Sequence, residues 1–166
     1  MITLACLYGM RVVAGGHASH TVLSLWLEAL AIFLFLSLAL VKRSAELVAR
    51  VQAGKVDATD ASGAQIAGRG YMLADLPVIE AMSAAAGYNA VLVLALYINS
   101  GAVRAAYAHP DRLFFLCVVL LAWISRMLVI TRRGWMNDDP IVFAVRDKWS
   151  MVIGALSAAV IFAATL

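Results

Sequence analysis

The stretch LFLSLALVKRSAEL, residues 34–47, decides the fold, because a long apolar run ends within it and a group of charged residues follows. No residue is charged from position 29 to position 41, and Lys42, Arg43 and Glu46 then follow at once. Their spacing places the three side chains on overlapping faces of one helix end. The run is typical of a membrane helix, and the charges predict either an anchor at the membrane edge or one wall of a polar site.

The composition excludes an ordinary soluble domain. Of the 166 residues, 64% are hydrophobic and 14% are charged, and the mean hydropathy is +0.90. A soluble domain has about half apolar residues and about a quarter charged ones. The net charge of +3 predicts no nucleic-acid partner, because Lys and Arg in the loops of a membrane protein set its orientation.

Apolar segments long enough to cross a bilayer, which takes about 20 residues, occur four times. They are Thr21–Val41, Leu76–Asn99, Arg112–Ile130 and Trp149–Leu166. Asp75 is expected to be the N-cap of the second segment, with Pro77 in its first turn. Residues 1–14 are also apolar but would span only about 21 Å as a helix. They are expected to be the tail of a helix whose beginning is missing. The predicted fold is an all-α transmembrane bundle of about five membrane helices.

The distribution of Lys and Arg predicts the orientation. Residues 42–75 and 131–149 are rich in cations, whereas residues 15–20 and 100–111 hold only Arg104. Loops rich in Lys and Arg therefore alternate with loops poor in them, as successive membrane crossings require. The two basic loops are expected to face the cytoplasm. Residues 51–73 are too polar for the bilayer and long for a helix connection, which predicts a partly ordered cytoplasmic cap.

Candidate site residues gather on the predicted cytoplasmic side. Arg11 is a separate candidate, because an arginine inside an apolar stretch is costly enough to suggest a function. The others are Lys42, Arg43, Glu46, Asp57, Asp60, Arg69, Asp138, Asp139 and Asp147.

Cations and carboxylates at a membrane face suit a phosphorylated amphiphile. Arg and Lys bind phosphate oxygens, and carboxylates can hold a Mg²⁺ ion that bridges phosphates. Glu46, Asp57 and Asp60 are the predicted metal ligands. Simpler roles remain open, namely lipid-headgroup anchors at Lys42 and Arg43, a helix N-cap at residues 138–139, and solvated loop carboxylates. A transporter is disfavoured, because few polar residues other than Arg11, Asn89 and Ser125 are expected within the spans.

Six blocks in order carry a family resemblance. They are LYGMRVVAGG, FLFLSLALVKRSAEL, GRGYMLADL, LYINS, WISR and DDPIVFAVRDKWS. Together they resemble the C-terminal half of a UbiA-superfamily intramembrane prenyltransferase, and the branch they resemble most is the decaprenyl-phosphate phosphoribosyltransferase-like one. The resemblance covers essentially the whole chain, residues 1–166.

The resemblance implies a nine-helix fold of which this chain supplies helices five to nine, with residues 51–73 as a cap over a cytoplasmic site. It implies a bacterial inner-membrane enzyme that joins 5-phosphoribosyl diphosphate to a polyprenyl phosphate and releases diphosphate. By this resemblance, Lys42, Arg43 and Glu46 stand at the position of the family's second acidic motif, where many members have DxxxD. Arg69 would be a further phosphate contact, as would Arg11.

One family motif is absent from the sequence, the first acidic motif NDxxDxxxD. The chain is therefore expected to be a fragment, inactive alone, that needs an N-terminal half. Two alternatives remain open. One is prenyl transfer to an aromatic acceptor, and the other is a non-catalytic remnant or scaffold that packs with other helices and with membrane lipids.

Overall fold

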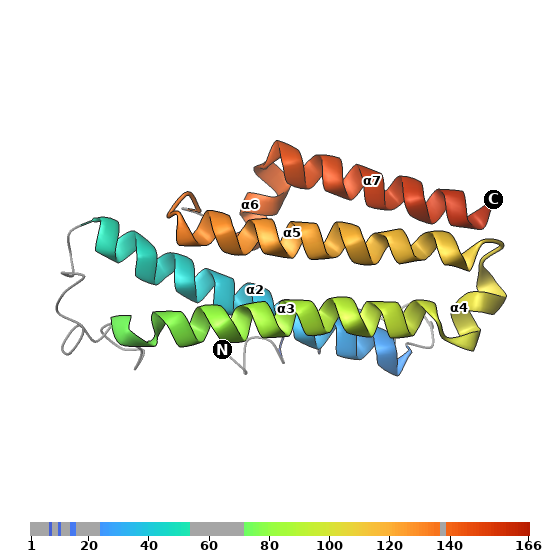
Figure 1. Cartoon of the computed structure of the whole chain (residues 1–166), viewed down its shortest axis with the longest axis horizontal. Helices are drawn as coiled ribbons and strands as arrows, with labels where there is room; N and C mark the ends of the chain where they lie inside the picture. Colours follow the sequence, from blue (N-terminus) through green and yellow to red (C-terminus); the bar gives the residue numbers. More distant parts are fainter. Residues whose placement is uncertain (1–6, 8–9, 11–13, 16–23, 54–71, 137–138) are drawn as a thin grey trace.

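The computed structural model of the chain is all-α over the residues that it describes, which are 24–53, 72–136 and 139–166 together with Leu7, Met10, Ala14 and Gly15. The elements are α2 (Leu25–Gln52), η1 (Leu73–Asp75), α3 (Leu76–Ile98), α4 (Gly101–Ala106), η2 (Pro110–Leu113), α5 (Phe114–Arg132), α6 (Pro140–Arg146) and α7 (Lys148–Thr165). The four long helices run side by side, and α7 lies along α5 on the side away from α3 (Figure 1).

The four expected spans correspond to α2, α3, α5 and α7, each long and apolar enough to cross a membrane. The chain is therefore a multi-pass membrane protein by the length and composition of its helices. Most of the expected fifth crossing at residues 1–14, all but Leu7, Met10 and Ala14, lies outside the described residues. So does most of the expected cap, residues 54–71.

The helix α2 is longer than expected, because it does not end at the charged group. It begins after Ser24, whose side chain accepts a hydrogen bond from the backbone N–H of Trp26, and continues to Gln52. Its 28 residues span about 42 Å, which exceeds the hydrocarbon thickness of about 30 Å. Lys42, Arg43 and Glu46 therefore lie where the helix leaves its apolar part, with further helix beyond them.

Small residues allow α2 and α3 to pack closely. Ser37 donates a hydrogen bond to the carbonyl of Ser83 at 2.9 Å, and Ser83 returns one to the carbonyl of Ser37 at 3.0 Å. Such bonds between membrane helices contribute about 0.6 kcal/mol each. One turn later, Gly87 lets α5 approach as well, since a Cβ there would meet Cγ2 of Ile124 at 2.6 Å. This contact fixes α2, α3 and α5 as a three-helix core.

The last turn of α5 shows why the chain turns there. Gly134 has φ of +71°, a conformation that glycine adopts without strain. The N–H of Trp135 bonds to the carbonyl of Ile130, and that of Gly134 to the carbonyl of Thr131. These two bonds form a Schellman motif that satisfies the last carbonyls of the helix.

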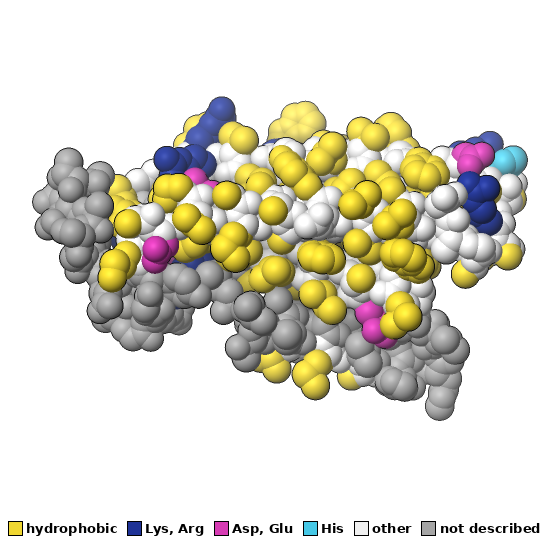
Figure 2. All heavy atoms as spheres, turned by 60° about the horizontal axis from the view of Figure 1, so that its bottom comes forward, with side chains coloured by type: hydrophobic (Ala, Val, Ile, Leu, Met, Phe, Trp, Pro, Cys, Tyr) yellow, Lys and Arg dark blue, Asp and Glu magenta, His cyan; other side chains and the backbone are white. Residues whose placement is uncertain are grey.

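Charged residues gather at the two ends of the bundle, and hydrophobic side chains cover most of the face between them (Figure 2). We call one end the Lys42 end; it holds residues 42–53, η1, the start of α3, the last turns of α5, and α6. The other, the Arg112 end, holds α4, η2 and the C-terminus of α7. There Arg112 donates a hydrogen bond to the carbonyl of Ala163, which joins η2 to α7.

Candidate functional site

Lys42 is the candidate residue that the structure places most favourably for a ligand. Its ammonium group lies 2.5 Å from a carboxylate oxygen of Asp139, and the two side chains are 43% and 31% exposed. Asp139 also accepts a hydrogen bond from the N–H of Ile141, at 3.0 Å, and so caps α6. The pair joins α2 to α6, and the expectation of an N-cap at residues 138–139 is confirmed at Asp139.

Arg43 is in a different environment from its neighbour. Its side chain is only 7% exposed, and its guanidinium donates to Glu46 at 2.5 Å within the same helix. The three charges of the opening motif therefore separate, since Lys42 pairs with α6 while Arg43 and Glu46 pair with each other. Glu46 is expected to bind metal, and in the folded chain its carboxylate neutralises a buried arginine.

A second ion pair joins α3 to α5. Nη1 of Arg132 donates to both carboxylate oxygens of Glu80, at 3.1 and 3.3 Å, and the hydroxyl of Ser44 on α2 donates to Glu80 at 3.4 Å. These residues, with Ser83 and Thr131, form the polar part of a cavity of about 230 Å³. The other walls are apolar and come from Val41, Ala84, Leu128 and Val129.

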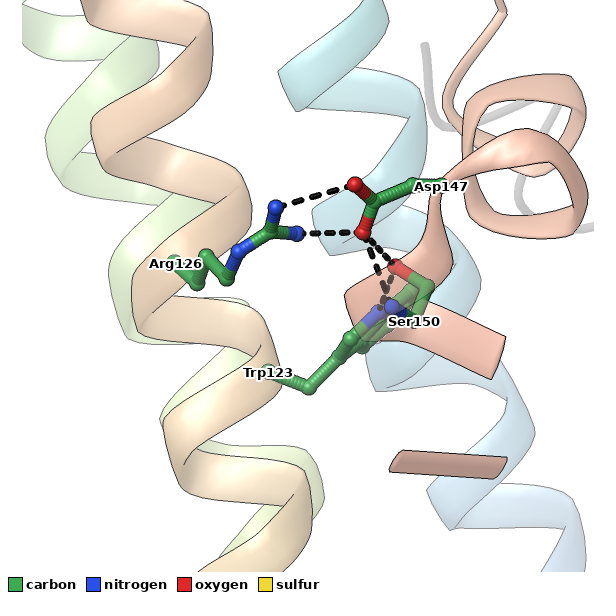
Figure 3. Close-up of polar contacts among 4 residues, drawn as sticks. All are labelled: Trp123, Arg126, Asp147 and Ser150. Carbon is green, nitrogen blue, oxygen red and sulfur yellow. Dashed lines mark hydrogen bonds and ion pairs between the residues drawn. The ribbon is translucent and has the colours of Figure 1, made fainter. Parts of the chain in front are cut away.

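A third network fixes α7 against α5 (Figure 3). Arg126 donates two hydrogen bonds to Asp147, at 2.6 and 3.0 Å. Asp147 also accepts from the backbone N–H and the hydroxyl of Ser150, at 2.8 and 2.9 Å, and so caps α7. Trp123 donates to the Ser150 hydroxyl at 3.1 Å. Asp147, a predicted site residue, therefore works as a helix cap and ion-pair partner.

Both aspartate caps are stabilised in the charged form. Burial raises the pKa of Asp139, but hydrogen bonds from Lys42 and the Ile141 N–H, with the charge of Lys42, bring the pKa below its usual value. Burial likewise raises the pKa of Asp147, and the bonds from Arg126 and Ser150 outweigh it, so that this pKa is also lowered. Asp139 and Asp147 are thus charged ion-pair partners of Lys42 and Arg126 at neutral pH.

Several predicted site residues lie outside the described residues, namely Arg11, Asp57, Asp60, Arg69 and Asp138. Among the described residues, no three His, Cys, Asp or Glu side chains converge to hold a metal ion. The magnesium prediction depends on Asp57 and Asp60, and it stays a prediction.

The sequence reasoning missed two charged residues. Glu80 and Arg126 lie within helices that are long enough to cross a membrane, so the expectation of few polar residues in the spans was wrong. Each is a charge in a predominantly apolar segment, which is the signal that could have identified them. Asp75 is the N-cap residue of α3, as expected, but its carboxylate does not cap that helix; it accepts from the N–H of Met72, before the helix, at 2.8 Å.

Comparison with known proteins finds two relatives from rhizobia. The chain is 33% identical over 152 residues to the nodulation protein NoeC of Azorhizobium caulinodans, a match that covers 92% of this chain and 47% of that protein. It is 31% identical over 156 residues to the uncharacterized protein y4nM of Sinorhizobium fredii, covering 93% of this chain and 29% of that protein.

The chain thus spans about half the length of one relative and less than a third of the other. No family model matches the chain. No solved structure matches it either. The names of the two relatives state no reaction, so the similarity does not specify the chemistry of this chain.

Proposed function

We propose that the chain is part of an intramembrane transferase of the UbiA type that joins 5-phosphoribosyl diphosphate to a polyprenyl phosphate and releases diphosphate. The part is expected to be the C-terminal half, and the reaction needs the remainder of the protein. Orientation in a bacterial inner membrane, with the Lys42 end toward the cytoplasm, belongs to the same proposal and rests on the loop charges.

The observation that carries the proposal is the position and exposure of Lys42. It lies where the apolar part of α2 ends, and its side chain is 43% exposed beside α6. A polyprenyl phosphate has a long apolar chain and a charged head, so its head must stay at such a boundary. An ammonium group there would bind the phosphate as a point charge, in competition with Asp139.

Diphosphate leaves in the proposed reaction, and negative charge develops on it as the bond to the ribosyl carbon breaks. A fixed cation near that charge lowers the barrier more than one that binds the substrate alone. Lys42 is proposed in this role. Arg43 is proposed to act indirectly, since its buried guanidinium, paired with Glu46, fixes the turn of α2 that carries Lys42. Mg²⁺ at Asp57 and Asp60 remains an untested part of the proposal.

The test is an activity assay on the protein expressed from its own locus with any adjoining segment. Membranes are given labelled 5-phosphoribosyl diphosphate and a polyprenyl phosphate, and labelled lipid is measured. Lys42→Ala is expected to lower turnover by roughly a hundredfold, whereas Arg50→Ala, an exposed cation in the last turn of the same helix, should keep it. Absence of labelled lipid with the native protein, or equal turnover in both variants, would overturn the proposal.

A scaffold function is the second candidate, and a specific observation favours it. In the described part of the chain, Lys42, Arg43, Arg126 and Arg132 each contact a carboxylate. The pairs of Lys42, Arg126 and Arg132 join different helices without any ligand, and the pair of Arg43 lies within α2.

The double variant Lys42→Asp with Asp139→Lys separates the two candidates. Reversing the charges should restore the link between α2 and α6 and therefore the stability of the fold. A scaffold would then keep its function, whereas a transferase would stay inactive, because a carboxylate would replace the cation at the phosphate.

A further inference from the structure

We propose that the groove between α3 and α5 at the Lys42 end binds the headgroup of an ethanolamine phospholipid from the surrounding bilayer. The groove is the cavity of about 230 Å³, far larger than the roughly 10–15 Å³ that a single water needs. This inference does not rest on the proposed transferase function, because Lys42 and Asp139 are not among the residues that line the groove.

The polar floor of the groove centres on the carboxylate of Glu80, whose side chain is 27% exposed. The hydroxyl of Ser44 donates to Glu80, that of Ser83 to the carbonyl of Ser37, and that of Thr131 to the carbonyl of Met127. These three residues are almost fully buried, so their hydrogen bonds hold the floor of the groove in place. With the carboxylate of Glu80, the floor suits a group that is positively charged and carries several N–H donors. A primary ammonium is such a group.

The rim of the groove supplies the complementary charge. The Arg132 side chain is 60% exposed, and both of its hydrogen bonds to Glu80 come from Nη1. Among the described residues, none accepts from its Nη2 or Nε. Guanidinium groups bind phosphate with two parallel hydrogen bonds. A phosphate therefore fits beside Arg132 while an attached ammonium reaches Glu80.

The groove lies at the level along the helices where a lipid of the surrounding bilayer would place its headgroup. Val41 is the last residue of the apolar run of α2, and Ser44 lies one turn beyond it. Apolar walls from Val41, Ala84 and Leu128 continue toward the bilayer centre and would contact the glycerol and the first carbons of the acyl chains. Phosphatidylethanolamine is favoured over phosphatidylcholine, because a quaternary ammonium has no N–H to donate, and over phosphatidylglycerol, which has no cation for Glu80.

The test measures lipid retained by the purified protein in native mass spectrometry, with ethanolamine, choline and glycerol phospholipids of identical acyl chains. The native protein should retain the ethanolamine lipid in preference to the other two. Glu80→Gln should lower that retention roughly tenfold, the loss expected for one charge-assisted hydrogen bond. Glu28→Gln, a matched change in the first turn of α2, should leave it unchanged.

Two further variants keep the test decisive. Arg132→Gln should weaken both the ethanolamine and the glycerol lipid, whereas its neighbour Arg133→Gln should not; Arg133 lies over the ring of Trp135. If Glu80→Gln does not fold, Ala84→Leu decides, since it fills the groove without removing a charge and should lower retention of all three lipids. Equal retention of ethanolamine and choline lipids by the native protein, or retention unaffected by Ala84→Leu, would overturn the proposal.

Discussion

Gly87 is the residue at which the packing of three helices leaves no room for a side chain. A Cβ there would lie 2.6 Å from Cγ2 of Ile124 and 2.9 Å from Oγ of Ser37. Overpacking of this kind costs about 1–3 kcal/mol. We expect Gly87→Ala to lower the free energy of unfolding in detergent by that amount, measured by loss of helicity with increasing denaturant.

Gly154 provides a matched control for this prediction. It also lies within a long helix, α7, but a Cβ at Gly154 would meet no atom within 4 Å. Gly154→Ala should therefore leave stability unchanged or raise it slightly, because alanine favours the helix more than glycine does. Equal destabilisation by both substitutions would show that the α2–α3–α5 contact is not as close as described.

The element most dependent on a few polar contacts is α7, which touches α5, α6 and η2 and only partly buries its surface. Asp147 provides both its N-cap and its ion pair with Arg126. Asparagine can cap a helix as well as aspartate but carries no charge. We expect Asp147→Asn to raise hydrogen exchange in α7 moderately and Asp147→Ala to raise it more. If the two variants exchange alike, the cap contributes nothing.

The same carboxylate predicts how α7 responds to acid. Because the pKa of Asp147 is lower in the folded protein than its unfolded value of about 3.9, its contribution is fully present above about pH 4 and is lost as the pH falls through the folded pKa. Exchange in α7, corrected for intrinsic rates, should stay constant from about pH 5 to 8 and rise below about pH 4. Asp147→Asn should remove this rise, and a rise that persists in that variant would assign it to another group.

The helices could be predicted from the sequence, whereas the contacts between them could not. An apolar run of about 20 residues must form its backbone hydrogen bonds internally in a bilayer, so α2, α3, α5 and α7 follow from composition. The pairing of Glu80 with Arg132 depends on which faces of α3 and α5 meet across 52 positions of sequence. Likewise, Lys42 and Arg43 are adjacent in sequence, but Lys42 pairs with Asp139 of α6 and Arg43 with Glu46 in its own helix, because neighbouring residues point about 100° apart around a helix.

At the scale of the whole molecule, the antiparallel order of the four long helices puts their three connections at two ends. The end of α2 and the start of α3 lie at the Lys42 end, and α4 lies at the Arg112 end (Figure 1). Charges collect at these ends because the apolar middle of each helix has no partner for them. If the helices cross a bilayer, the two ends must face opposite sides of it.

Cysteine labelling of cells that express the protein tests this arrangement, in a background without the two native cysteines. Exposed alanines are replaced one at a time, Ala53 and Ala74 at the Lys42 end and Ala102 and Ala105 in α4. A membrane-impermeant maleimide added outside should label only the α4 pair, and all four should react after permeabilisation, because the basic loops are proposed to face the cytoplasm. Labelling of only the Lys42-end pair from outside would reverse the orientation and leave the fold intact. Different behaviour of Ala53 and Ala74 would contradict the fold itself, since the end of α2 and the start of α3 must share one side of the membrane.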